Sequence, residues 1–146
     1  HHLYNEEDRI VTRAGHPLVG RGDVQFADLA KYEWICSAGS ERFHRDFLNL
    51  FYEAGCQPPP VAVASDSIEV TRALLLQSDR LALLPQSTID LFEQNGLLSV
   101  IDFKPASWQR AVSICTRRRG SFPPLVRIFI EELRNAARAL AERHQA

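Results

Sequence analysis

The chain lacks the features of a protein that spans or crosses a membrane. No stretch of its 146 residues approaches the ~20 apolar residues that a membrane-spanning helix needs. Its start, HHLYNEEDRI, has neither the basic segment nor the apolar core of a secretory signal. The two leading histidines resemble a tag remnant and are left out of the fold prediction. We expect a cytoplasmic protein.

An excess of one charge sign is also missing. Seventeen Lys and Arg residues stand against 18 Asp and Glu residues, which leaves a net charge of −1. A domain that binds nucleic acid by itself usually has a basic face that neutralises phosphates, so this balance argues against direct DNA binding by the chain. The composition, with 45% hydrophobic and 24% charged residues, is that of a globular protein.

Cysteine is scarce. Cys36, Cys56 and Cys115 are odd in number, widely spaced and free of a CxxC pair. Neither a disulfide framework nor a zinc site is therefore expected, and the cysteines are consistent with the reducing cytoplasm. We expect no metal and no other cofactor.

What the chain does contain is an alternation of apolar strands and amphipathic helices. Segment 40–55, for example, repeats apolar residues at helical spacing and stops at Gly55. The alternation predicts an α/β domain with a largely parallel sheet. Strands are expected at 9–13, 34–37, 61–65, 80–85, 97–103 and 109–117, and helices at 24–32, 40–55, 66–77, 87–95 and from Ser121 onward.

Two helices carry more detailed expectations. Asp66 has Glu69 three residues on, which predicts a capping box at the start of a helix. Ser121 is expected to cap the last helix, with prolines in its first turn. The expected buried stripe of that helix consists of Leu125, Phe129, Leu133, Ala136 and Leu140.

Three strand-to-helix units resemble one another: WICSAGS, VAVASDS and LALLPQST. In an open α/β sheet, loops at the carboxyl ends of strands form the ligand site. Helix N-termini there favour an anion, and serine hydroxyls can orient it. The alternative is that Ser40, Asp66 and Ser87 only cap helices. Asp66 would also repel an anionic ligand unless its charge is used on its own helix.

Catalytic candidates are weaker. Cys36 lies at a strand end near a helix start, where a thiolate would be stabilised, although a small buried cysteine is the more ordinary interpretation. His16 and His44 have no visible orienting partner, and no GxSxG elbow is present. We do not expect an enzyme. The aromatic residues Trp34 and Phe47, with Phe51, are expected in the core.

Five segments carry a resemblance to a known family, namely NEEDRIVTRAGHPL, FADLAKYEWI, SDSIEVTRALLLQSDRLALLP, NGLLSVIDF and RAVSICTRRRGSFPPLVRIFIEELR. In this order they resemble the effector-binding domain of the LysR-type transcriptional regulators. The match runs through nearly the whole chain, and the combination of RxGHPL with the later LALLP strand is fairly specific. SDRLALLP is similar to the branch that includes the galactose-binding-protein regulator.

The resemblance implies an α/β fold like that of type 2 periplasmic binding proteins, with two lobes joined by crossover strands and an effector in the cleft. Residues 1–16 would end lobe one and form the first crossover, 17–112 would form lobe two, and 113–146 would supply the return strand and the C-terminal helix of lobe one. The implied effector-binding residues are Ser37, Ala38, Gly39, Ser40, Ser65, Asp66, Ser67 and Thr116.

The implied function is sensing of a small metabolite, carboxylate or sugar-like, to modulate transcription. Self-association as a dimer or higher oligomer would cover the last helix, and DNA would be bound only by a helix-turn-helix domain that this sequence does not contain. The chain is therefore expected to be a fragment. A solute-binding protein of a transport system with the same fold is the alternative, and an enzyme using Cys36 is a third hypothesis.

Overall fold

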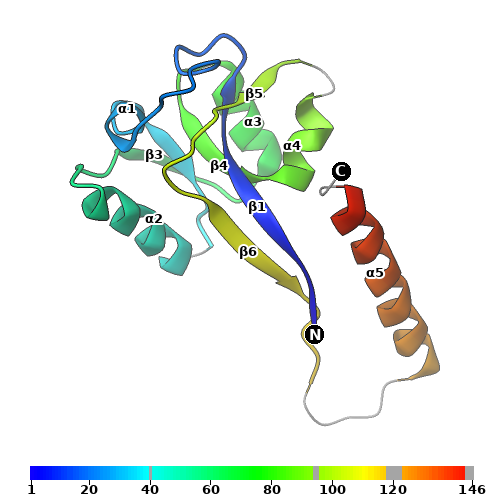
Figure 1. The fold of residues 1–146 in the computed structure, drawn as a ribbon. Coiled ribbons are helices and arrows are strands. Elements are labelled where there is room, and N and C mark those ends of the chain that lie inside the picture. Colours follow the sequence, from blue (N-terminus) through cyan, green and yellow to red (C-terminus); the bar gives the residue numbers. More distant parts are fainter. Residues whose placement is uncertain (40, 94–95, 118–122, 144–146) are drawn as a thin grey trace. The chain divides into compact units, whose positions relative to one another are not determined.

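The computed structural model describes residues 1–39, 41–93, 96–117 and 123–143, without the side chains of 41–43, 91, 93 and 141–143. Contacts divide the chain into two compact units, Glu7–Trp108 and a second formed by His1–Glu6 with Gln109–Ala146. The elements (Figure 1) are β1 (His2–Arg13), α1 (Phe26–Leu29), β2 (Trp34–Cys36), α2 (Glu41–Glu53), β3 (Val61–Ala64), α3 (Ile68–Leu76), β4 (Leu81–Pro85), α4 (Gln86–Glu93), β5 (Leu98–Val100), β6 (Trp108–Ser113) and α5 (Pro124–Arg143).

The strands form a mixed sheet in the order β3-β2-β4-β1-β5, and β6 pairs with β1. β2 is parallel to both β3 and β4, whereas β1 is antiparallel to β4 and β5. The α/β prediction is confirmed. The prediction of a largely parallel sheet holds for the pairing of β2 with β3 and β4 and is wrong for the pairing of β1 with β4 and β5. β1 runs against these two neighbours rather than being joined to them by a helical crossover.

Helices cover both faces of the sheet in the larger unit (Figure 1). Side chains alternate across a strand, so Trp34 and Cys36 enter one core and Ile35 enters the other. The first core contains residues from α1 and α2, including Leu29, Phe47 and Phe51. The second contains residues from α3 and α4, with Leu75 and Ile89 fully buried. Trp34, Phe47 and Phe51 are core residues, as predicted.

β1 is longer than the predicted strand at 9–13. The prediction missed the residues before Arg9 because buried positions among them carry acidic side chains. Glu6 is 3% exposed and Asp8 is 7% exposed, at the same alternate positions as Ile10. A pattern based on apolar residues cannot recognise an inward position that carries a carboxylate. Glu6 is matched by Arg110 of β6, whose Nη2 lies 2.7 Å from Glu6 Oε2.

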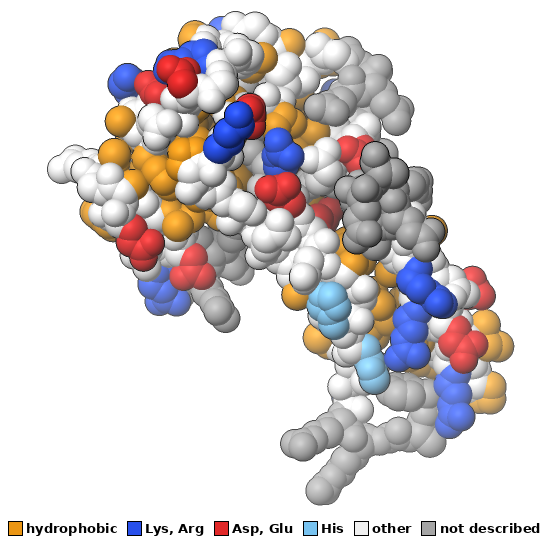
Figure 2. Space-filling model, in the orientation of Figure 1, with side chains coloured by type: hydrophobic (Ala, Val, Ile, Leu, Met, Phe, Trp, Pro, Cys, Tyr) orange, Lys and Arg blue, Asp and Glu red, His pale blue; other side chains and the backbone are white. Residues whose placement is uncertain are grey.

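The prediction of a buried stripe on the last helix is wrong for the described side chains. Leu125 is 76% exposed and Phe129 61%, Ala136 is exposed, and Leu133 and Leu140 are only partly buried, whereas Ala137 is buried. Apolar side chains accordingly appear at the surface of the region that contains α5 (Figure 2). The expected cap, Ser121, lies outside the described residues.

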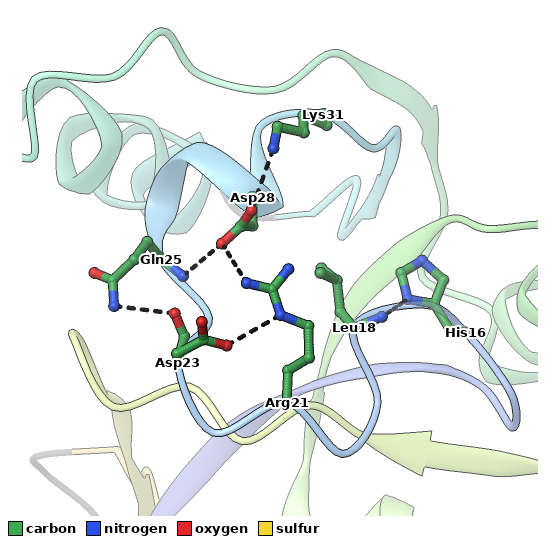
Figure 3. A network of polar contacts seen from close by, with 7 residues as sticks. All are labelled: His16, Leu18, Arg21, Asp23, Gln25, Asp28 and Lys31. Carbon is green, nitrogen blue, oxygen red and sulfur yellow. Dashed lines mark hydrogen bonds and ion pairs between the residues drawn. The ribbon is translucent and has the colours of Figure 1, made fainter.

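The RxGHPL segment at 13–18 holds the turn after β1. Gly15 has φ of +79°, a conformation that glycine adopts without strain. The Nδ1 atom of His16 accepts a hydrogen bond from the amide of Leu18 at 3.1 Å, as Figure 3 shows, so the proton is on Nε2, which lies 3.2 Å from the carbonyl oxygen of Asp79. Arg13 binds the Asp79 carboxylate at 2.6 Å. The motif therefore fastens the turn to the segment before β4.

A second polar network follows it (Figure 3). Arg21 binds Asp23 at 3.0 Å and reaches Asp28 at 3.5 Å. Asp28 also accepts from the Gln25 amide at 3.2 Å and binds Lys31. Because Asp28 lies in the first turn of α1, these bonds fix the start of that short helix.

We expect the free energy of unfolding to fall as the pH decreases below about 6.5, because His16 is neutral in the folded chain. Burial lowers the pKa of His16 from its ordinary value of 6.5, with the Asp79 carbonyl acting in the opposite direction. The unfolded chain therefore takes up the proton first, so this contribution is complete above the unfolded pKa and declines toward the lower folded pKa. Urea denaturation between about pH 7.5 and pH 5 measures the slope. His16→Asn should flatten the slope relative to the matched variant His44→Asn; equal slopes would contradict this role of His16.

Candidate functional site

The loops that follow β2 and β3 meet at one edge of the sheet. β2 and β3 are parallel neighbours, so their carboxyl ends lie side by side. The amide of Ser65 donates to the carbonyl of Cys36 at 2.9 Å, which continues the pairing one residue past the end of β3. The residues that the sequence predicts for the site in these loops are therefore brought together, namely Ser37, Ala38, Gly39, Ser65, Asp66 and Ser67.

Asp66 ties the two loops together. Its Oδ1 atom accepts from the Ser37 hydroxyl at 2.6 Å, from the Ala38 amide at 2.9 Å and from the Gly39 amide at 3.2 Å. The Ser37 hydrogen bond is the main reason that the pKa of Asp66 lies below its ordinary value, followed by the Gly39 amide. Gly39 suits this contact, since a Cβ atom there would lie 3.2 Å from Asp66 Oδ2. Asp66 is therefore an ionised carboxylate held by the neighbouring loop.

The predicted capping box of Asp66 and Glu69 is wrong. Ser67 is the N-cap of α3, and its hydroxyl accepts from the amide of Val70 at 3.3 Å. Glu69 instead binds Arg72 one turn later, at 3.1 Å. Asp66 is not needed as the cap of α3, because the hydroxyl of Ser67 already accepts from the Val70 amide in the first turn.

For two of the predicted residues, membership of the site stays a prediction. Ser40 lies outside the described residues. Thr116 is exposed and belongs to the other compact unit, so its part in the site stays a prediction. The PQST segment is not a free loop, because α4 begins at Gln86 directly after β4, and Gln86 donates to Asp90 of its own helix at 2.7 Å.

Nucleophilic catalysis by Cys36 is not supported. Cys36 is 8% exposed, and burial raises the pKa of its thiol to about 11. A thiol with that pKa is protonated at neutral pH and is a poor nucleophile. Among the described residues, no group of three or more His, Cys, Asp and Glu side chains could hold a metal ion. No described helix is both long and apolar enough for a membrane span.

A cavity of about 460 Å³ lies away from these loops, between α2 and the segment before β3. The sequence analysis did not predict it, because the three prolines at 58–60 indicate only a break in regular structure. The spacing of four residues between His44, Leu48 and Tyr52, which places them on one face of α2, was the available signal. The cavity is lined by His44, Leu48, Tyr52, Gln57, Pro58, Pro59 and Val61. No Asp, Glu, Lys or Arg side chain is among its lining residues, so it lacks a group that would orient a charged ligand.

Comparison with known proteins gives consistent matches. Residues 1–138 match the family model of the LysR substrate-binding domain. The HTH-type transcriptional regulator PcaQ of Agrobacterium fabrum is 25% identical over 137 residues, which are 93% of this chain and 44% of PcaQ. The regulator GbpR of Rhizobium radiobacter is 26% identical over 124 residues, 85% of this chain and 40% of GbpR. These similarities are nearly equal, so the branch within the family stays a prediction.

Comparison with solved structures shows a similar fold. The CcmR regulatory domain of Synechocystis PCC6803, solved in complex with 2-PG, superposes with a TM-score of 0.72 at 17% identity, over 94% of this chain and 65% of that one. The fold like that of type 2 periplasmic binding proteins is thereby confirmed. The chain spans less than half the length of the curated relatives it matches. These relatives are regulators, neither enzymes nor transport proteins, and the chain belongs to the LysR substrate-binding-domain family.

Proposed function

We propose that the chain is the effector-sensing part of a LysR-type transcriptional regulator and that the loops at 37–39 and 65–67 contact a small metabolite. The observation that carries the proposal is the joining of these loops by Asp66 at the carboxyl ends of two parallel strands. This is the edge at which open α/β sheets bind ligands. The complex of the similar CcmR domain with 2-PG supports a small-molecule ligand.

No bond of the metabolite is made or broken in this function. A ligand that binds one shape of the domain more tightly shifts the population toward that shape. The proposed consequence of this change of shape is altered binding to DNA. DNA would be bound by a helix-turn-helix domain, the domain type in the names of the curated relatives. Self-association stays a prediction, and the exposed side chains of α5, Leu125, Ile128 and Phe129, are the apolar surface it would cover.

A thermal-shift screen of small metabolites on the complete gene product tests the site. We expect Ser65→Ala to reduce the response to the most effective compound by about tenfold in apparent affinity, the effect of one lost hydrogen bond. Ser65 is a sharper probe than Ser67, because Ser67→Ala also removes a helix cap. Ser99→Ala in β5 is the matched control and should leave the response unchanged. An equal response in the wild-type protein, Ser65→Ala and Ser99→Ala would exclude Ser65 from the site.

A further inference from the structure

The two amides that converge after β2 form a site for an anion, and the chain fills it with its own carboxylate. Backbone N–H groups that point to one place beside a helix N-terminus ordinarily bind phosphate or carboxylate groups. Here the Ala38 and Gly39 amides point to one oxygen of Asp66, at 2.9 and 3.2 Å, and the Ser37 hydroxyl joins them at 2.6 Å. An incoming anion would have to displace Asp66 from three hydrogen bonds.

From this geometry we infer that Asp66 excludes carboxylate and phosphate groups from the loops and that the effector presents alcohol groups there. The inference rests on the proposed effector site and narrows the ligand class expected from the sequence, which included both carboxylates and sugar-like molecules. Asp66 is ionised at neutral pH, since its hydrogen bonds to Ser37 and Gly39 lower its pKa. The charge of Asp66 therefore repels an acidic ligand, and its carboxylate oxygen already occupies the amides of Ala38 and Gly39.

The hydrogen-bonding groups left over at the loops can both accept from and donate to a ligand, which suits an alcohol. Oδ2 of Asp66 accepts no hydrogen bond from a described residue and can accept one from a ligand. The Ser65 hydroxyl already accepts from the Ser67 amide at 3.2 Å, and the Ser67 hydroxyl accepts from Val70, so both retain a hydrogen to donate. An ammonium group only donates and a carboxylate only accepts, whereas an alcohol does both. Gly39 leaves the side of Oδ2 uncovered.

Matched pairs of compounds test this inference on the complete gene product. The pairs are glucose with glucuronate and galactose with galacturonate, which differ in a single alcohol or carboxylate group. Binding is measured by calorimetry for the wild-type protein, for Asp66→Ala, and for Asp102→Asn as a control with an exposed acid elsewhere. We expect the wild-type protein and Asp102→Asn to favour the neutral sugar. Asp66→Ala frees the Ala38 and Gly39 amides and should shift the preference toward the acid by about tenfold or more.

Each other outcome overturns a defined part of the inference. Wild-type protein that favours the acids, with a response that Ser65→Ala still weakens, would overturn the alcohol assignment and leave the effector site intact. An unchanged preference in Asp66→Ala would show that Asp66 does not select the ligand. Protein that binds neither member of any pair, but binds in the thermal-shift screen a compound without alcohol groups whose response Ser65→Ala weakens, would also overturn the alcohol assignment and leave the effector site intact. If Asp66→Ala does not fold, Asp66→Asn keeps an oxygen for the amides without the charge and should weaken the rejection of acids; unchanged rejection would again overturn the inference.

Discussion

Replacing Phe47 with alanine is expected to lower the free energy of unfolding by about 3–5 kcal/mol, the largest effect of any single substitution considered for this chain. Phe47 is 1% exposed, and its ring lies 4.7 Å from that of Trp34 and 5.2 Å from that of Phe51. The ring fills the space between α2 and the sheet. Alanine would leave a cavity there that the two neighbouring aromatic rings cannot collapse to fill.

Equilibrium denaturation in urea measures this difference, and α2 offers its own control. Tyr52 is on the same helix and is 64% exposed, so Tyr52→Ala should change the free energy of unfolding by no more than about 0.5 kcal/mol. Similar losses for Phe47→Ala and Tyr52→Ala would contradict the assignment of the aromatic cluster to the core.

Replacing Arg110 with methionine is expected to cost about 2–3 kcal/mol, more than replacing Glu6 with glutamine. The pair is asymmetric, since the side chain of Glu6 is 2% exposed and that of Arg110 is 48% exposed. Removing Arg110 withdraws two hydrogen bonds, at 2.7 and 3.2 Å, from a buried carboxylate. Removing the charge of Glu6 instead leaves a guanidinium that water can still reach.

A double-mutant cycle with Arg110→Met and Glu6→Gln, measured by urea denaturation, tests this asymmetry. The double variant should be more stable than Arg110→Met alone, because it no longer buries a carboxylate without this cation. Arg72→Met, in the exposed pair of Arg72 with Glu69, is the matched control and should cost much less. If Arg110→Met and Arg72→Met cost the same, the burial of Glu6 does not matter to stability.

The order of strands and helices could be predicted because most of the elements follow apolar spacing. The first half of β1 could not, since Glu6 and Asp8 occupy inward positions. The exposure of α5 could not be predicted either, because the amphipathic pattern of a helix does not show which other surface covers its apolar face.

The candidate site was predictable to the level of its loops. Parallel strands place their carboxyl ends together, so the approach of 37–39 and 65–67 follows from the α/β pattern. The role of Asp66 does not, because its bonds to Ser37 and Ala38 join residues 29 and 28 positions apart. Local sequence offered Asp66 a cap that Ser67 takes instead.

Hydrogen–deuterium exchange of the complete gene product, with and without the most effective compound of the thermal-shift screen, tests most directly whether the two loops bind the effector. We predict slower exchange in peptides that contain 37–39 and 65–67, because a bound ligand would hold these loops closed and make the opening of their hydrogen bonds rarer. Unchanged exchange in both loops, with protection only around the cavity between α2 and residues 57–61, would contradict the proposed site.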